Sequence, residues 1–436
     1  MPPMPLIFAA TCDFAGKVRG KAFPADQLDK RLQRGVGWVP TNVMINCFDG
    51  IGDSPFGSLG DLLLVPDPTT ETKVGFAGKA PEHFMLGDIV TLEGKPWELC
   101  TRSLLKSALE RLHRVAGVRL ISAFEHEFQL KGAPAIDNQG FGREGFELQR
   151  DLCETLMAAL QSTGIVPDSI MKEYGPNQYE VVVGPSAGVT AADQAVILRE
   201  LTRSAARAKG EHATFTPIMD PASVGNGVHI HMSFVDDDGA PVTYDPEGKC
   251  GMSALTSAFS AGILKYLPSI IALTAPSVVS YERLTPHRWS AAYNNLGFRD
   301  REASLRVCPV TAKDPASIAR QFNIEYRAAD AAACPHLALA AIVHAGVQGI
   351  EDGLVAPDPT QEDLSLLSPK VLAERGYVRL PTTLEAALDQ FANDDTVGSW
   401  FPKELSQVYC AHKTAELAHL GDMEIQAMCD LYAQTY

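Results

Sequence analysis

The sequence has little positive charge. Its 436 residues hold 37 Lys and Arg against 53 Asp and Glu, which gives a formal net charge of −16. Sequence-independent DNA binding needs a basic face that displaces counterions from phosphates, so the composition argues against nucleic-acid partners. A small phosphate-bearing molecule is still compatible with it, because a local arginine cluster can lie inside an acidic protein.

Paired cysteines and long apolar runs are also lacking. The nine cysteines are scattered and odd in number, and none forms a Cys-x-x-Cys pair, which argues against a disulfide framework or a zinc knuckle. No run reaches the roughly 18 apolar residues that span a bilayer. The apolar stretch within Met1–Ala10 follows no basic segment of the kind that secretory signals carry. We therefore expect a cytoplasmic protein with reduced thiols and no membrane partner.

The remaining composition is that of a globular protein, with 46% hydrophobic and 21% charged residues. The length predicts two or three domains. Short apolar runs between Gly, Pro and Asp, such as Val43–Phe48 and Leu62–Val65, predict strands joined by turns in the first hundred residues. A helical pattern begins at Thr101, so we place a domain boundary near residue 97. Its apolar positions are Leu104, Ala108, Leu112 and Val115, and Gly117 follows as a stop.

Beyond residue 97, strand and helix patterns alternate. Thr190 and Asp193 have the spacing of an N-cap and its third helical position, which predicts a helix from there to Gly210. Further helices are predicted over residues 252–266, 314–322 and 331–351, and across 383–435.

Acids and imidazoles interrupt several strand patterns on one face only. Alternate residues of a strand share a face, so three segments each present polar side chains together. These side chains are Glu125 with Glu127, His229 with His231 and Ser233, and Glu325 with Arg327. A fourth segment places Glu173 and Glu180 on either side of a Gly-Pro turn.

Each strand alone could have one solvated face, as half-buried antiparallel strands do. Together the segments lack the Lys and Thr expected of solvated faces. If they converge, they form an oxygen-rich site that is unstable without cations and that favours Mg²⁺ or Mn²⁺ over zinc. The expected ligands are Glu125, Glu127, Glu173, Glu180, Glu325 and His229. His126 lies on the apolar face and is predicted to be a core histidine with satisfied hydrogen bonds.

Arginines form a second group, within 45 residues: Arg283, Arg299, Arg301, Arg306 and Arg327. The guanidinium fork suits phosphate and carboxylate. Surface ion pairing is the alternative, but Arg301, Arg306 and Arg327 have neighbours typical of buried strands, which favours function. Metal ligands and arginines together indicate phosphoryl transfer. No Gly-x-x-x-x-Gly-Lys-[Ser/Thr] segment occurs, so a P-loop is excluded. The residues predict a metal- and phosphate-handling enzyme without naming its substrate.

Five segments resemble successive catalytic signatures of the glutamine synthetase family, in its bacterial type I-like branch, in order and at suitable spacing. They are Glu125–Glu127, Glu173–Glu180, Gly225–Ser233, Asp300–Arg306 and Ile324–Arg327. Near the N-terminus, Asp13–Lys21 is similar to a family segment of the form Asp-x-x-Gly-x-x-Arg-Gly-Lys. Phe48–Gly50, followed by Val65–Asp67, is similar to the loop that reaches a neighbouring subunit's active site. The resemblance covers most of the chain.

The resemblance implies an α+β fold. An N-terminal β-grasp domain would span residues 1–97, and a large catalytic domain with a curved antiparallel sheet would span residues 98–436. The implied assembly is a homo-oligomer, a dodecamer of two stacked hexameric rings whose active sites are shared between subunits.

The resemblance also implies residue roles, in an active site with two or three Mg²⁺ or Mn²⁺ ions and ATP as cosubstrate. One metal ion would be held by Glu127, Glu173 and Glu180, and a second by Glu125, His229 and Glu325. ATP would be bound by His231, Ser233, Phe215 and Arg306. Arg301 and Arg306 would handle phosphate, and Arg283 and Arg327 the amino-acid substrate and its transferring phosphoryl group. Gly225 would also bind substrate. Asp49 of an adjacent subunit would help bind and deprotonate an amine, near His287 and Trp289.

Two departures from the family pattern concern the substrates. Glutamine synthetases carry an Asn where this sequence has Val224, and a flap Glu that closes the ammonium site where it has Trp289. An indole suits a larger and less polar amine than ammonium. The chain also has no Asn-Leu-Tyr-Asp segment near its C-terminus resembling the adenylylation site of regulated enzymes. It therefore looks more like the γ-glutamylamide and γ-glutamylpolyamine synthetases.

We expect an ATP-dependent ligase that joins the γ-carboxylate of glutamate to an organic amine through γ-glutamyl phosphate. Three alternatives stay open. The first is a glutamine synthetase that uses ammonium. The second is a catalytically silent member with a structural or regulatory role, against which the intact ligand set speaks. The third is a ligase for another carboxylic acid, which Val224 makes conceivable.

Overall fold

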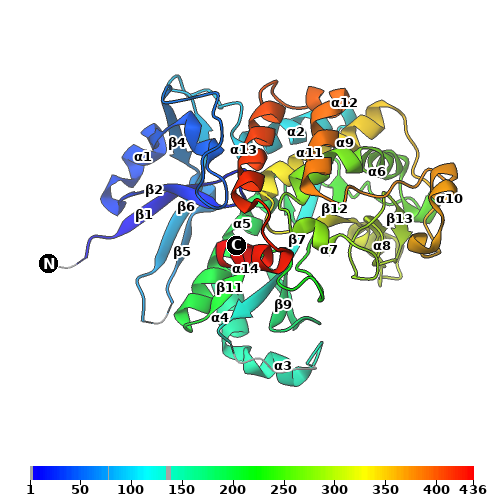
Figure 1. Cartoon of the computed structure of the whole chain (residues 1–436), viewed down its shortest axis with the longest axis horizontal. Coiled ribbons are helices and arrows are strands. Elements are labelled where there is room, and N and C mark those ends of the chain that lie inside the picture. Colours follow the sequence, from blue (N-terminus) through cyan, green and yellow to red (C-terminus); the bar gives the residue numbers. More distant parts are fainter. Residues whose placement is uncertain (1–2, 77, 134–138) are drawn as a thin grey trace.

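The computed structural model describes residues 3–76, 78–133 and 139–436. A smaller N-terminal sheet unit lies beside a larger unit of helices packed on a second sheet (Figure 1). The expected α+β architecture, an N-terminal sheet domain followed by a large catalytic domain with a curved sheet, is confirmed.

The N-terminal sheet has six strands in the described part of the chain. Their order is β2 (Val18–Pro24), β1 (Leu6–Cys12), β6 (Glu82–Val90), β4 (Leu62–Pro66) and β3 (Val36–Trp38), and β5 (Thr72–Val74) also pairs with β6. β1 and β6 run parallel, and the other pairs are antiparallel. The predicted strand at Leu62–Val65 is confirmed as β4.

The predicted strand at Val43–Phe48 is wrong. Residues Pro40–Met44 form a 3₁₀ helix, and Pro40 stands at its first position, where a missing N–H costs nothing. A turn then follows around Asn46, whose side-chain oxygen accepts hydrogen bonds from Phe48 N (3.0 Å) and Gly50 N (2.9 Å). The turn leaves Asp49 exposed.

The catalytic sheet is nine-stranded within the described residues. Its order is β13 (Leu296–Phe298), β14 (Leu305–Val307), β15 (Ile324–Ala329), β12 (Val228–Val235), β7 (Arg119–Lys131), β9 (Gln178–Val183) and β8 (Pro167–Lys172). Two short strands, β10 (Ser186–Ala187) and β11 (His212–Thr214), also pair with β7. Only the β13–β14 pair is parallel among these nine strands. Because β7 and β12 lie at the centre, their polar face is positioned by neighbours on both sides.

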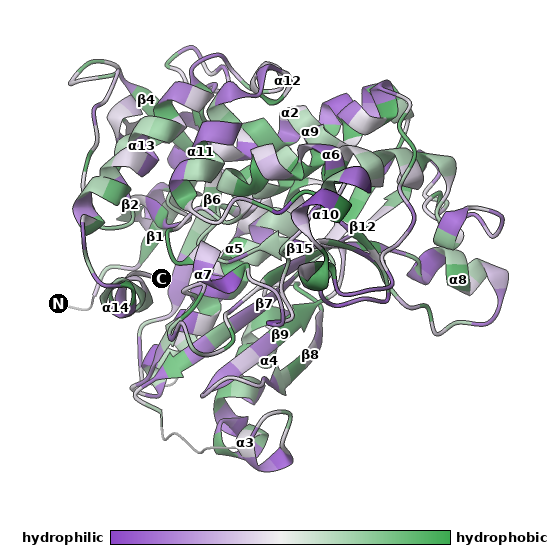
Figure 2. Ribbon diagram, turned by 45° about the vertical axis from the view of Figure 1, so that its right-hand side comes forward, coloured by the Kyte–Doolittle hydropathy of each residue, from purple (hydrophilic) through white to green (hydrophobic). Residues whose placement is uncertain are grey.

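Four long helices form the main apolar layer: α2 (Thr101–Ala116), α5 (Val189–Ala208), α6 (Ala254–Thr274) and α9 (Pro335–Glu351). α9 packs against α2, α5 and α6, and its residues from Pro335 to Val347 are all buried. Figure 2 shows mostly hydrophobic ribbon along α6 and α9, the two most apolar of these helices. The remaining helices are α1 (Leu28–Arg34), α3 (Arg143–Leu148), α4 (Arg150–Ser162), α7 (Ser280–Arg283), α8 (Pro315–Gln321), α10 (Pro369–Glu374), α11 (Leu384–Asn393), α12 (Asp395–Ser399), α13 (Leu405–Leu420) and α14 (Ile425–Thr435).

The predicted helices are present, but several begin or end at residues other than those predicted. The helix at Thr101 is confirmed, with Gly117 in the left-handed conformation as its C-cap. The N-cap prediction for Thr190 is wrong, because α5 begins at Val189 after Gly188, and Thr190 lies inside it. α6 continues through Pro268 to Thr274. Residues 383–435 form four separate helices.

α6 is the one helix among the described residues that is long and apolar enough to cross a membrane by length and composition. Of its apolar window, 67% is buried inside the protein. Packing against α9 therefore accounts for its apolar composition.

Arg102 of α2 connects the two units. Its fully buried guanidinium donates to Asp193 of α5 (2.8 Å), Asp88 of β6 (3.1 Å) and Asp67 (3.0 Å). His336 Nε2 lies 2.8 Å from Asp193 Oδ1. A buried cation with several carboxylate partners keeps its charge compensated, so this network holds the N-terminal sheet against α5 and α9.

Candidate active site

The register of the catalytic sheet brings four candidate ligands together. Glu127 of β7 faces Glu180 of β9, and Glu125 of β7 faces His229 of β12. His229 Nδ1 lies 3.4 Å from Glu125 Oε2. The faces predicted to converge do converge on one side of the sheet.

The same face continues across β15 and β14. His231 of β12 faces Glu325 of β15, which in turn faces Arg306 of β14. Arg306 Nη1 donates to Glu325 Oε2 (2.7 Å), and Arg327 also donates to this carboxylate. Glu325 is 1% exposed, so two buried guanidinium groups balance its charge.

Two sets of donor atoms lie within 4.8 Å of one another: Glu125 with Glu180 and His229, and Glu125 with His231 and Glu325. Either set could hold a divalent cation. The grouping differs from the resemblance, which separates Glu180 from Glu125 and assigns His231 to ATP. Glu127 and Glu173 lie beside the first set and line the adjoining cleft.

The electrostatics of the cluster suit a cation. Burial and the neighbouring carboxylates of Glu125 and Glu127 raise the pKa of Glu180 to about 9. Burial, with Glu173 nearby, raises the pKa of Glu127 to about 7. Burial also opposes ionisation of Glu325, but Arg327 and the two histidines outweigh it and lower the pKa of Glu325 to about 2. Part of the cluster thus resists full ionisation until a positive charge enters it.

The backbone around Glu127 is tightly packed. Glu127 Oε2 accepts hydrogen bonds from Gly227 N (2.9 Å) and Gln178 Nε2 (3.2 Å). A Cβ on Gly225 would lie 2.4 Å from Pro217 O and 2.7 Å from Arg283 Cγ, so only glycine allows the chain to pass there. The predicted substrate residues Gly225 and Arg283 both line the cleft beside Glu127.

The arginines differ in exposure. Arg283 is 3% exposed, and its Nη1 has no hydrogen-bond partner among the described residues. Arg327 Nη2 donates to Trp289 O (3.0 Å), and its Nε donates to Arg301 O (3.2 Å). Arg301 itself is exposed in the loop before β14, so the buried-strand environment expected for it is wrong.

Aromatic side chains stand at the mouth of the cleft. Trp289 and Tyr174 meet edge to face, with ring centroids 5.5 Å apart. They are 51% and 59% exposed and line the cleft together with Glu173 and Val224. The flap position therefore presents an aromatic wall beside carboxylates.

Other predicted site residues lie elsewhere. Phe215 is fully buried on the opposite face of β7, packed against His126 and Phe128, so its side chain does not join the cluster. Asp49 pairs with Arg19 (2.9 Å) on the N-terminal unit.

Ser233 and His287 are each placed to one side of the cluster. Ser233 shares the strand face of His231 on β12. His287 points to the outer side of the flap, where its Nε2 lies 3.3 Å from Asp363 Oδ2.

His126 is buried as predicted, and burial lowers its pKa to about 3. The prediction that its hydrogen bonds are satisfied is wrong, because Nδ1 has no partner within the described chain.

The sequence patterns missed several residues of this site. Gln178 and Tyr174 lie within the Glu173–Glu180 segment, so their closeness to two predicted ligands could have identified them. Asn323 Oδ1 lies 2.8 Å from His231 Nδ1 and orients that imidazole so that Nε2 faces Glu125 (3.1 Å). Asn323 precedes β15 and belongs to no alternating or motif pattern, so nothing in the sequence singles it out.

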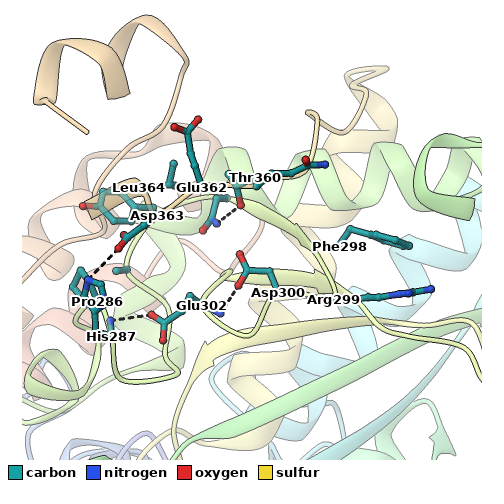
Figure 3. Close-up of a pocket in the computed structure, with 14 residues that line it drawn as sticks. Pro286, His287, Phe298, Arg299, Asp300, Glu302, Thr360, Glu362, Asp363 and Leu364 are labelled. Carbon is teal, nitrogen blue, oxygen red and sulfur yellow. Dashed lines mark hydrogen bonds and ion pairs between the residues drawn. The ribbon is translucent and has the colours of Figure 1, made fainter. Parts of the chain in front are cut away.

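A second cavity, of about 640 Å³, opens on the outer side of the flap. Figure 3 shows Pro286, His287 and Glu302 along one side of it and Glu362 with Asp363 along another. Glu302 accepts hydrogen bonds from the backbone of His287 and Trp289, so this carboxylate supports the flap from behind.

Comparison with known proteins shows the family to which the chain belongs. Residues 98–429 match the model of the glutamine synthetase catalytic domain, and residues 1–97 match that of the glutamine synthetase N-terminal domain. The chain belongs to the glutamine synthetase family. Members of this family are ATP-dependent ligases that form carbon–nitrogen bonds, and this chain is such a ligase. The family generally uses divalent metals and small-molecule substrates and is typically oligomeric.

Relatives in the glutamine synthetase family carry two kinds of name. The γ-glutamylpolyamine synthetase GlnA3 of Streptomyces coelicolor is 31% identical over 99% of this chain and 93% of its own length. The type-1 glutamine synthetase 1 of Dictyostelium discoideum is 29% identical over 95% of this chain and 86% of its own. The glutamine synthetase of Pyrococcus woesei is 30% identical over 88% and 84%.

Solved structures of the glutamine synthetase fold superpose over the whole chain. One described as a novel glutamine synthase homolog has a TM-score of 0.92 and 40% identity, covering 100% of this chain and 99% of its own. A GmaS/ADP complex has a TM-score of 0.81 at 22% identity, covering 98% and 96%, which shows the shared fold.

Metal-free protein is expected to lose thermal stability as the pH rises from about 7 to about 9. The folded state binds protons at Glu127 and Glu180 more tightly than the unfolded chain, where the pKa is 4.5. Their contribution to the free energy of unfolding is therefore complete below pH 4.5 and is lost progressively above it, up to about pH 7 for Glu127 and about pH 9 for Glu180, so Glu180 accounts for most of the loss between 7 and 9. In this window the buried histidines with lowered pKa are already neutral in both states, since their ordinary value is 6.5. Melting temperatures of chelator-treated protein across this range test the prediction.

Glu180→Gln should flatten that pH dependence, and Mg²⁺ or Mn²⁺ should stabilise the wild type most at the alkaline end. Glu154→Gln, which changes a carboxyl on α4, is the matched control and should leave the slope unchanged. A melting temperature that rises with pH in metal-free wild type would contradict the prediction.

Proposed function

We propose that this glutamine synthetase family ligase joins the γ-carboxylate of glutamate to an organic amine through γ-glutamyl phosphate. The observation that carries the proposal is the aromatic wall of Trp289 and Tyr174 beside Glu127 and Glu173. A cleft for ammonium needs a compact anionic cage, whereas aromatic faces beside carboxylates suit an alkylammonium group.

The first step uses the buried end of the cleft. A γ-carboxylate oxygen of glutamate attacks the γ-phosphorus of ATP, the bond to the bridging oxygen breaks, and ADP leaves. Arg283 and Arg327 bind the amino acid, and Arg301 and Arg306 bind phosphate oxygens. Bound Mg²⁺ or Mn²⁺, two or three per site, would screen the repulsion between the two anions. The ligands are Glu125, Glu127, Glu173, Glu180, His229 and Glu325, with His231 and Ser233 near ATP.

The second step uses the mouth of the cleft. The amine enters as a cation along the aromatic wall of Trp289 and Tyr174, with Val224 adding apolar surface and Glu173 a negative charge. After it loses a proton to Asp49 of an adjacent subunit or to another base, its nitrogen attacks the acyl carbon and phosphate leaves. This requires a shared site in a homo-oligomer, for which we propose the dodecamer of two hexameric rings. His287, on the outer side of the flap, is proposed to support this wall.

The names of the relatives support the class of reaction, and they point to two different kinds of acceptor for the glutamyl group. The name of the Streptomyces coelicolor relative refers to polyamines, and those from Dictyostelium discoideum and Pyrococcus woesei refer to glutamine. Ammonium is therefore the second candidate acceptor.

Phosphate release from ATP, measured with glutamate and a panel of alkyl, aryl and polyamine acceptors plus ammonium, tests the proposal. We expect kcat/KM for at least one organic amine to exceed that for ammonium by roughly a hundredfold, the discrimination that an apolar and cation–π pocket can supply. Product mass identifies the γ-glutamylamide. A preference for ammonium over every organic amine would reject the organic acceptor. Release with another acid but not with glutamate would redirect the carboxylate assignment, and no turnover with any acceptor would favour a silent family member.

A further inference from the structure

The flap, here residues Thr285–Ser290, has an unfavourable backbone. His287 has φ of 64° and Trp289 has φ of 51°, both in the left-handed region that residues with side chains rarely adopt. Such a conformation persists only when surrounding contacts over-determine it. The contacts that do so therefore decide where the Trp289 indole stands.

Glu302 supplies the central contact. Its Oε2 accepts from His287 N (3.0 Å) and its Oε1 from Trp289 N (2.6 Å), so both oxygens of one carboxylate hold the two strained residues. Figure 3 shows Glu302 among the residues that line the outer cavity, next to His287 of the flap. Hydrogen bonds to a charged acceptor are stronger than neutral ones, which suits a clamp on a strained turn.

Arg327 and Arg288 hold the flap through further hydrogen bonds. Trp289 O accepts from Arg327 Nη2 (3.0 Å), and Arg327 also pairs with Glu325 in the cluster. Arg288 between the strained residues donates to Ser223 O (2.9 Å), next to Val224. The backbone of Trp289 is thus held at its N–H by Glu302 and at its carbonyl by Arg327, which is proposed to bind glutamate.

We infer that Glu302 is a positioning residue for amine selectivity: it clamps the flap so that the Trp289 indole stands against Tyr174 at the mouth of the cleft. The inference rests on the proposed function, because it assigns the cause of the selectivity at that same site. Glu302 touches no substrate, and it acts through the backbone of residues 287–289.

Glu302→Gln tests the clamp with little change of shape. The amide offers one acceptor oxygen, so one of the two backbone N–H groups loses its partner. KM for the preferred amine should rise roughly tenfold, while KM for ATP and glutamate stays within about twofold, the effect of losing one charge-assisted hydrogen bond. Glu362→Gln is the matched control: this acid lines the same outer cavity but pairs with Arg375 and should change neither value. Equal rises in every KM, or none, would overturn the inference.

Fluorescence gives a readout that needs no ligase activity. The chain has four tryptophans, so the Trp289 signal is isolated by subtracting a Trp289→Phe variant in each background. Acrylamide quenching of Trp289 should increase in Glu302→Gln, and also in Glu302→Asp, whose side chain is one methylene shorter and holds the carboxylate farther from the two N–H groups. Unchanged quenching in both variants would overturn the clamp. If the wild type prefers ammonium, the amine panel alone rejects the proposal of an organic acceptor. The quenching experiment still tests whether Glu302 holds Trp289 in place.

Discussion

Replacing Glu325 with Gln is expected to lower kcat for glutamate-dependent ATP turnover roughly a thousandfold. Glu325 is a candidate metal ligand and the buried partner of both Arg306 and Arg327. An amide keeps the shape but removes the charge, so a ligand is weakened and two guanidinium groups lose their counter-ion. Breaking a buried pair from one side costs about 3–5 kcal/mol, and we therefore expect a lower melting temperature as well.

Phosphate release under saturating ATP and glutamate measures this effect, and calorimetry with Mn²⁺ measures the accompanying loss of metal affinity. Glu200→Gln is the control, because Glu200 pairs with Arg203 on α5, away from the acidic face. It should retain wild-type turnover. Wild-type turnover in Glu325→Gln would remove Glu325 from the proposed site, provided that size-exclusion chromatography shows an unchanged assembly.

Replacing Trp289 with Ala is expected to lower kcat/KM for the preferred organic amine about a hundredfold, while the value for ammonium changes by less than about threefold. The indole contributes an aromatic face and apolar area, each worth about 1–2 kcal/mol to a desolvated alkylammonium group. Ammonium has no alkyl part to contact that face. Competition between the two acceptors, read by product mass, measures the change in preference.

Trp289→Phe is the matched control, because a phenyl ring keeps an aromatic face against Tyr174. It should lose much less than Trp289→Ala. Equal losses for ammonium and the organic amine would show that Trp289 supports the fold of the flap rather than acceptor choice. An unchanged preference in Trp289→Ala would remove the aromatic wall from the proposed function.

The polar faces could be predicted because alternation along a strand is a local property. Glu125 with Glu127, and His229 with His231, share a face whatever the strand pairs with. Their meeting with Glu325 depends on sheet register, which alternation does not contain. The resemblance to the family implied which residues share a metal ion, but the sets within ligand distance differ from those it implied.

Other parts of the site depend on turns and loops, which follow no period. Arg301 stands in a loop, so its neighbours in β14 gave a misleading expectation of burial. Phe215 follows a short strand whose pairing with β7 places it on the apolar face. The clamp by Glu302 depends on two left-handed residues, for which the sequence offered no glycine as a signal.

The Arg102 network has a consequence for how the ligase changes over evolution. Because one buried guanidinium joins carboxylates from both units, a rotation of the N-terminal sheet against the catalytic sheet would break buried ion pairs. In the shared site proposed above, the position from which Asp49 reaches the adjacent subunit would then be fixed relative to the catalytic sheet of its own chain. On the proposed function, substitutions in the flap could change acceptor choice without moving the proposed subunit contacts or the arginines proposed to bind phosphate.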